Sequence, residues 1–275
     1  MYPIGYNRGE YEYMKRYFLF AFFAIVGIFT IITVGFSRLP TVAEQSQRFI
    51  FASPFDLSQV SALSQYRSCI GHDYRGPMVA TGKFEASPRS LKHYVKVKPE
   101  FRGTVDAVPV FAPFDGQVSL VHDDFGAPGD QQIWLTPHTD TPEIPRQWQF
   151  IFFHIKLDPA LGKGSTVAAG QKIGTANLRR GPDNATDNFD IAMKFTRPLH
   201  RPAIDSVFHH MTNEVLKEYE EFNIRPADLI ISEEYRDRHA CPFLPMGQGG
   251  QDPNTIYFPP EAGSNEYIFL QNFYK

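Results

Sequence analysis

The chain is short of cysteine and has no surplus of charge of either sign. Its 275 residues include only 2 cysteines, and its 27 lysines and arginines face 30 aspartates and glutamates, which gives a net charge of -3. A nucleic-acid-binding protein needs a basic surplus, so we expect no nucleic-acid partner. Internal repeats and low-complexity tracts are also missing. With 43% hydrophobic and 21% charged residues, the composition excludes a disordered or fibrous chain.

Phenylalanine, in contrast, is abundant, with 25 residues in the chain. Part of this excess lies in residues 17–37, an apolar run without any charge between Arg16 and Arg38. At about 1.5 Å per helical residue, such a run spans the roughly 30 Å hydrocarbon core of a bilayer. Lys15 and Arg16 precede the run and favour a cytoplasmic N-terminus. We therefore predict one transmembrane helix at 17–37, after a cytoplasmic segment, 1–16.

A cleaved signal peptide is the alternative for this segment. The apolar region of a signal peptide is usually shorter than 17–37, and no small-x-small cleavage site follows the run. We prefer an uncleaved, single-pass signal anchor in the cytoplasmic (inner) membrane. Residues 38–60 are then predicted to form a stalk, and residues 61–275 an extracytoplasmic domain.

That location changes how the two cysteines are interpreted. Cys69 and Cys241 form an even pair in an oxidising compartment, which favours a disulfide that closes a loop of about 170 residues. Two unpaired thiols are the alternative. Asn184 begins an Asn-x-Thr sequon, which is a glycosylation site only where the host modifies such sequences.

Short apolar or alternating runs, separated by Gly, Pro and Asp, fill residues 104–197. This pattern is typical of an antiparallel β-sheet or sandwich. After it, over 203–222, apolar residues recur at helical spacing. We therefore predict a mainly β fold with a C-terminal helical elaboration, preceded by the transmembrane helix.

Three motifs in this β region resemble the lysostaphin/LytM-type zinc endopeptidases of cell walls, which have a duplicated hybrid motif. That family carries an A-P-x-x-G-x-V turn, a Tyr-x-His-Leu-like strand, a G-x-x-V-x-x-G-Q-x-I-G turn and finally a His-x-His strand. The first three occur here in the same order, at Ala112, Pro113, Gly116, Val118, His154, Gly164, Val167, Gly170, Gln171, Ile173 and Gly174. The resemblance implies a LytM-like β core at about 93–197.

The resemblance also implies a zinc site, whose motifs are incomplete here. The family binds zinc through the His and Asp of a His-x-x-x-Asp segment and the second His of His-x-His, leaving one open position for water. His93 falls where the first ligand is expected, but the residue four positions later is Val97 instead of Asp. His154 takes the place of a catalytic histidine that is not a ligand.

The sequence DNFDIAMKF replaces the His-x-His strand. One alignment places Asn188 and Asp190 on the two histidine positions, and the other places Asp190 and Ala192 there. Under the first alignment Asp190 remains available as a carboxylate ligand. Under the second alignment only His93 survives as a ligand.

Two further residues, His72 and Asp73, offer compensating ligands beside Cys69. Each candidate also has a structural alternative: a hydrogen-bonded strand histidine for His154, an Asx-type turn beside the disulfide for His72 and Asp73, and an exposed strand face for Asp190.

Our preferred interpretation is a membrane-anchored envelope protein with a peptidase-like domain that binds peptidoglycan or a protein partner without catalysis. The alternative is a divergent zinc-dependent endopeptidase or hydrolase that acts on cell-wall peptide. It would use His72 or Asp73, His93 and Asp190 as ligands and His154 as general acid/base. A remote alternative is a biotinyl- or lipoyl-type carrier, with Lys194 of the sequence AMK as the attachment point on an exposed hairpin.

Overall fold

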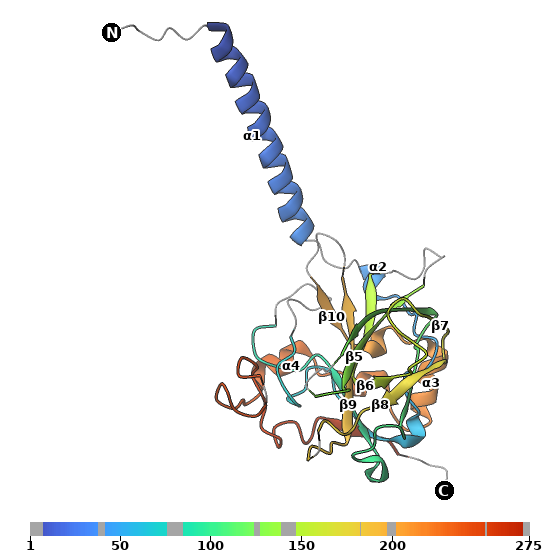
Figure 1. Cartoon of the computed structure of the whole chain (residues 1–275). Helices are drawn as coiled ribbons and strands as arrows, with labels where there is room; N and C mark the ends of the chain where they lie inside the picture. Colours follow the sequence, from blue (N-terminus) through green and yellow to red (C-terminus); the bar gives the residue numbers. More distant parts are fainter. Residues whose placement is uncertain are drawn as a thin grey trace.

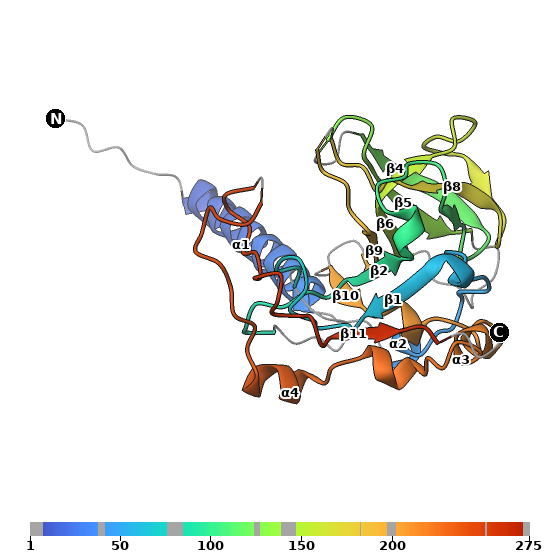
Figure 2. The same cartoon turned by 90° about the horizontal axis from the view of Figure 1, so that it is seen from below.

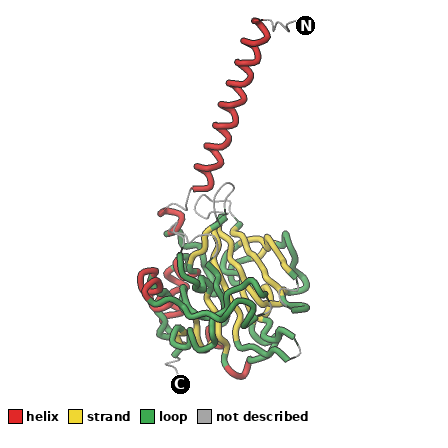
Figure 3. Tube along the Cα trace, turned by 90° about the vertical axis from the view of Figure 1, so that its left-hand side faces the viewer, coloured by secondary structure: helices red, strands yellow, loops and turns green. Residues whose placement is uncertain are grey.

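A long N-terminal helix, α1 (Arg8–Ser37), precedes a β domain in the computed structural model of the chain (Figure 1). The structure describes residues 8–37, 42–75, 85–123, 127–138, 147–181, 183–196, 202–250 and 252–271, and within α1 it describes the side chains of residues 13–28. The α1 ribbon extends away from the β domain (Figures 1 and 3). Its described large apolar side chains are exposed, Phe18 by 83% and Phe20 by 78%.

The predicted membrane span coincides with the second part of α1. Within the described residues, no helix is both long and apolar enough to cross a membrane. The predicted span 17–37 continues over residues 29–37, whose side chains lie outside the described part of the chain.

Eleven strands of the described residues form one sheet, drawn in yellow in Figure 3, and every pairing between them is antiparallel. The main order is β11-β1-β2-β9-β6-β5-β4-β7, while β10 pairs with β9, and β8 pairs with β3 and β6. The strands are β1 (Val60–Ser64), β2 (His93–Val97), β3 (Pro109–Phe111), β4 (Gly116–His122), β5 (Gln131–Pro137), β6 (Trp148–Leu157), β7 (Thr166–Val167), β8 (Lys172–Ala176), β9 (Asn188–Phe195), β10 (Ala203–Asp205) and β11 (Tyr267–Phe269). The prediction of a mainly antiparallel β fold is confirmed.

The remaining helices are short. They are α2 (Val42–Gln45), α3 (Asn213–Glu220) and α4 (Glu233–Arg238), with 3-10 turns η1 (Leu57–Gln59), η2 (Pro99–Phe101), η3 (Val207–His209) and η4 (Pro226–Leu229). In Figure 2, α3 and α4 lie on the side of β1 and β11, away from β4 and β8. The C-terminal helical elaboration is therefore present.

The helical spacing over 203–222 does not correspond to one helix. Ser206 and Thr212 both have extended backbone angles, and each caps a separate element. The Ser206 hydroxyl accepts a hydrogen bond from the Phe208 amide, and the Thr212 hydroxyl accepts one from the Val215 amide. These two caps divide the segment into β10, η3 and α3.

The odd-numbered residues of β2 and β9 and the even-numbered residues at the start of β6 form the core side of the sheet. Residues predicted to form a stalk pack into this core: Phe49, Ile50, Phe55, Leu57 and Val60 are all buried. The prediction of a stalk at 38–60 was therefore wrong for residues 49–60, because these five apolar side chains are part of the core. Residues 38–41 of the predicted stalk lie outside the described residues.

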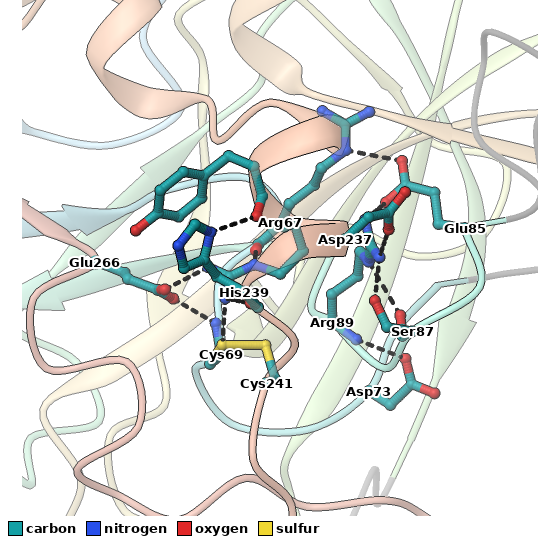
Figure 4. Close-up of a disulfide and its surroundings, with 12 residues drawn as sticks. Arg67, Cys69, Asp73, Glu85, Ser87, Arg89, Asp237, His239, Cys241 and Glu266 are labelled. Carbon is teal, nitrogen blue, oxygen red and sulfur yellow. Dashed lines mark hydrogen bonds and ion pairs between the residues drawn. A yellow bond between two sulfur atoms is a disulfide. The ribbon is translucent and has the colours of Figure 1, made fainter.

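The predicted disulfide between Cys69 and Cys241 is confirmed, with an S–S distance of 2.08 Å (Figure 4). It joins the segment before β2 to the start of the C-terminal segment 242–271. The Glu266 carboxylate accepts a hydrogen bond from the Cys69 amide and also pairs with Arg236. A Cβ on Gly263 would lie 2.3 Å from Ile70 Cγ1 and 3.0 Å from the Cys69 carbonyl oxygen, so only glycine fits this close approach.

Candidate functional site

A buried ion pair joins β2 and β9 on the face of the sheet opposite the core. Lys92, which directly precedes β2, places its Nζ 2.8 Å from Asp190 Oδ2. Both side chains are 2% exposed. The register pairs Tyr94 with Asp190, so the even-numbered residues of both strands share this face.

The Lys92 ammonium is enclosed by a histidine and two aromatic rings. It donates to His72 Nε2 at 3.2 Å, and it lies 3.9 Å from the centroid of the Phe153 ring and 4.6 Å from that of Tyr74. The other nitrogen of His72, Nδ1, donates to the Asp73 carbonyl. The ammonium thus has a carboxylate, an imidazole and two π-faces as partners.

Burial and charge fix the protonation states of this cluster. Burial and the neighbouring Lys92 charge lower the pKa of His72 to about 4, so this imidazole is neutral at neutral pH. Burial also lowers the pKa of Lys92, against the opposing effect of Asp190. Burial alone raises the pKa of Asp190, but the charges of Lys92, His154 and Arg180 outweigh it and hold that pKa well below its usual range.

His154 reaches the same face through a β-bulge. Gln131 pairs with Ile155 and Gln132 with Phe153, so His154 is an extra residue on β6, and its φ is 59°. Before the bulge the core residues of β6 are even-numbered (Phe150, Phe152), and after it they are odd-numbered (Ile155, Leu157). The bulge therefore turns His154 out of the core and toward Asp190.

A second carboxylate orients the His154 ring. His154 Nδ1 donates to Asp130 Oδ2 at 2.6 Å, and Asp130 Oδ1 accepts from Nδ2 of the Asn177 side chain at 3.3 Å. Asp130 is fully buried, and the His154 side chain is 15% exposed. With Nδ1 held in this way, His154 Nε2 points to Asp190 Oδ1, 3.9 Å away.

Asp190 Oδ1 is a buried acceptor without a hydrogen-bond partner in the described structure. The 3.9 Å between it and His154 Nε2 is longer than a direct hydrogen bond. Because a buried acceptor without a partner costs free energy, this gap marks a place where a donor group of water or of a ligand is favoured.

His93 is not part of this cluster. It faces the core side, where its Nδ1 donates to the Ser64 carbonyl at 2.9 Å and its Nε2 accepts from the Ser206 hydroxyl at 2.8 Å. Burial lowers the pKa of His93 to about 4. Both ring nitrogens are occupied, and successive residues of a strand point to opposite faces. The prediction that His93 and Asp190 bind one metal ion was therefore wrong.

Asp73 is also directed elsewhere. Its carboxylate pairs with Arg75 at 2.8 Å and accepts from the Arg89 amide at 3.2 Å (Figure 4 shows Asp73 with Arg89). Of the predicted site residues, the structure thus brings together His72, Asp190 and His154, and leaves His93 and Asp73 in structural contacts.

The residues of this cluster do not fit a zinc ion. A zinc site needs about three N or O donors around one point. Here that point between His72 and Asp190 is occupied by the Lys92 ammonium, which is itself a cation and a donor. Among the described residues no three His, Cys, Asp or Glu side chains are grouped to hold a metal ion.

Sequence reasoning missed Lys92 and Asp130. Lys92 stands in the run SLKHYV, where a lysine among apolar and aromatic residues at a strand start indicates a buried charge with a partner. Asp130 ends the loop before β5 and has no sequence signal of its own. Only the pairing of β5 with β6 places it beside His154.

Two other predicted residues have plain locations. Lys194 lies within β9, is half-buried and pairs in register with Gln149, so it is not on an exposed hairpin. This location contradicts the carrier-type attachment point. Asn184 is exposed in the loop between β8 and β9, and its glycosylation stays a prediction.

No protein-family model and no curated protein matches the chain. Solved structures do align with it. A zinc-containing peptidase from Vibrio cholerae aligns at 18% identity and a TM-score of 0.34, over 57% of this chain and 39% of that one. The catalytic domain of the antimicrobial peptidase lysostaphin from Staphylococcus simulans aligns at 16% identity and a TM-score of 0.30, over 48% and 82%. Csd3 from Helicobacter pylori aligns at 14% identity and a TM-score of 0.35, over 65% and 42%.

The chain thus resembles the lysostaphin/LytM group in its motifs, and structures of that group are among those that align with it. The aligned part spans less than half of the Vibrio and Helicobacter proteins. The antiparallel strand pairing of the chain itself defines the mainly β fold.

Proposed function

We propose that this protein is a membrane-anchored envelope protein whose LytM-like β domain binds cell-wall peptidoglycan without cleaving it. One observation supports this proposal most directly. The Lys92 ammonium forms hydrogen bonds with Asp190 and His72 at the place where the sequence predicts a metal ion. A bound zinc ion would supply an acidified water for attack on an amide. An ammonium balances the charge of Asp190 but has no open coordination position, so it supplies no such nucleophile.

The face around this ion pair keeps features that suit a peptide ligand. Asp190 Oδ1 is an acceptor without a partner, and the buried side chains of Ile151, Phe153 and Ala192 form an apolar cluster beside it. A peptide N–H group that reaches Asp190 Oδ1 would satisfy this acceptor.

The sequence of α1 and the disulfide support the proposed location. The uncharged run 17–37, with Lys15 and Arg16 before it, favours a single-pass anchor with a cytoplasmic N-terminus. The exposed apolar side chains of α1 need a covering environment, which lipid provides. The Cys69–Cys241 disulfide favours an oxidising compartment for the β domain.

The test combines metal analysis with binding to the wall. Purified full-length protein in mild detergent is incubated with zinc, desalted and analysed for metal, and is then sedimented with purified peptidoglycan sacculi. We expect much less than one zinc per chain, co-sedimentation with sacculi, and no soluble fragments released. Stoichiometric zinc together with wall cleavage that His154→Ala abolishes would overturn the proposal. Binding only to another envelope protein, and not to sacculi, would also overturn it in favour of a protein partner.

A divergent hydrolase is the second candidate, and one observation favours it. Asp130 orients His154 so that Nε2 faces the gap beside Asp190, as a general acid or base requires. Release of muropeptides by the wild type, but not by Asp130→Asn or His154→Ala, would support this candidate over the binding module.

A further inference from the structure

The same face of the sheet carries a second lysine, whose surroundings differ from those of Lys92. Lys194 lies four residues beyond Asp190 on β9 and therefore points to the same face. At about 3.3 Å per residue, the two positions are separated by about 13 Å along the strand. The side chains of Asp190 and Lys194 thus lie near opposite ends of one stripe on this face.

Lys194 has no carboxylate partner among the described residues. Its Nζ lies 4.4 Å from the centroid of the Trp134 ring, and burial lowers its pKa. The two other lysines on this side are paired, Lys92 with Asp190 and Lys96 with Asp187. A half-buried cation without a counter-charge is unfavourable, and a bound anion would stabilise it.

Two further polar atoms beside Lys194 are buried without hydrogen-bond partners in the described structure. They are the indole Nε1 of Trp134 and the amide oxygen of Gln149. Gln149 is directly opposite Lys194, and Trp134 is opposite Ile151, the next residue of β6 on this face. Since the oxygen and nitrogen of a glutamine amide are interchangeable by rotation, Gln149 can present its NH₂ group as a donor.

We propose that Lys194, Trp134 and Gln149 form a binding site for a carboxylate, specifically the C-terminal carboxylate of a peptide that lies along this face. An ammonium, an indole N–H and an amide N–H are all donors, and an ionised carboxylate accepts from all three. A neutral amide or a cation at this place would leave donors without acceptors. This inference rests on the proposed peptide-binding function and names the group that the site recognises.

The spacing also sets the length of the ligand. An extended peptide advances about 3.3 Å per residue, so the 13 Å between the two sites corresponds to about four residues. A tetrapeptide with its carboxylate at Lys194 would extend along the strand as far as Asp190, whose Oδ1 is the acceptor without a partner. The site therefore suits short peptides with a free C-terminus better than internal stretches of a longer chain.

Tryptophan emission provides the measurement, because the chain has only 2 tryptophans. Trp148 is fully buried on the core side, so a ligand on the opposite face changes mainly the emission of Trp134. Full-length protein in mild detergent is titrated with a disaccharide–tetrapeptide muropeptide that has a free carboxylate, with its C-terminal amide, and with sodium acetate. We expect saturable quenching by the free acid, at least tenfold weaker binding of the amide, and competition by acetate only at much higher concentration.

Three variants complete the test. Lys194→Met is expected to weaken binding of the free acid at least tenfold, and Lys194→Arg to retain it within about threefold. Lys96→Met, a lysine on the neighbouring strand with its own partner, serves as the matched control and is expected to bind as the wild type does. The comparison of acid with amide needs no variant, so it remains decisive even if Lys194→Met does not fold.

Equal binding of the acid and the amide, or unchanged binding by folded Lys194→Met, would overturn the carboxylate site. If the protein still binds sacculi in either case, the proposed wall-binding function stands without the carboxylate site. If acetate bound as tightly as the muropeptide, the site would be one for free small carboxylates, and the peptide assignment would be overturned. Absence of binding to both muropeptides and sacculi would overturn both proposals.

Discussion

Lys92 and Asp190 form an ion pair between β2 and β9 with Nζ and Oδ2 2.8 Å apart and both side chains 2% exposed. The removal of two charges from water is expensive, and their attraction offsets this cost only while both partners are present. The pair therefore links two central strands of the sheet. We expect the fold to be destabilised less by apolar replacement of both residues than by replacement of one.

The first prediction concerns the removal of one partner. Lys92→Met leaves the Asp190 carboxylate buried beside aromatic rings, and we expect the free energy of unfolding to fall by about 3–5 kcal/mol. The double variant Lys92→Met/Asp190→Leu removes both charges and is expected to recover most of that loss. Urea unfolding of the wild type, both single variants and the double variant measures the coupling.

The matched control is the more exposed pair Lys96–Asp187, in which the side chains are 37% and 27% exposed. Because exposed pairs contribute little, Lys96→Met is expected to change the free energy of unfolding by less than about 1 kcal/mol. Equal effects of Lys92→Met and Lys96→Met, or additive single effects in the double variant, would contradict the role given to the buried pair.

The second prediction is a loss of stability on acidification through His93. Burial lowers the pKa of His93 from 6.5 to about 4 in the folded protein. Between these values the unfolded chain binds a proton that the folded chain does not, so stability falls as the pH decreases from about 6.5 to about 4. From pH 7 to 4.5 this corresponds to a loss of about 2 to 3 kcal/mol.

His93→Gln removes the titrating group and keeps a side chain that forms hydrogen bonds. Urea unfolding at pH 7 and at pH 4.5 is expected to show a smaller loss for this variant than for the wild type. An identical loss in both proteins would show that His93 does not contribute to the acid sensitivity.

The sheet and the disulfide could be predicted from the sequence because their signals are local or compositional. Alternating apolar runs separated by turn residues identify antiparallel strands. Cys69 and Cys241 are the only cysteines, so a single pairing was available to predict. The buried residues at 49–60 were missed because a short apolar segment next to a predicted membrane anchor resembles a linker until its packing partners are known.

The site could be predicted only in part, because strand register decides which face a residue occupies. A shift of one residue separates His93, on the core side, from Lys92, on the site side. At His154 the alternation itself changes, since the bulge adds one residue to β6. The sequence FIFFHIKL does not show where a bulge interrupts the pattern. Asp130 becomes a partner of His154 only through the pairing of distant strands.

The third prediction tests the bulge. His154 has a φ of 59°, in the left-handed region that favours glycine. His154→Ala and His154→Gly both lose the bond to Asp130, but only alanine keeps a side chain in this conformation, so His154→Gly is expected to be more stable by about 1 kcal/mol. At Lys156, an exposed residue of the same strand, the order is expected to reverse. Urea unfolding of the four variants measures both differences, and the same order at both positions would argue against strain at His154.

The fourth prediction concerns the disulfide, which holds the C-terminal segment 242–271 against the segment before β2. Cys69 and Cys241 are 172 residues apart, and a cross-link of such a long loop restricts the unfolded chain strongly. We therefore expect the double variant Cys69→Ala/Cys241→Ala to lose about 2–5 kcal/mol of unfolding free energy, measured with urea under non-reducing conditions. Because β11 still pairs with β1, the sheet should remain, while limited proteolysis cuts first within 242–266, before β11. The wild type with a reducing agent is the control and should behave as the variant does. A loss below about 1 kcal/mol, or first cuts within the sheet, would show that the hydrogen bonds and ion pairs of this segment hold it without the disulfide.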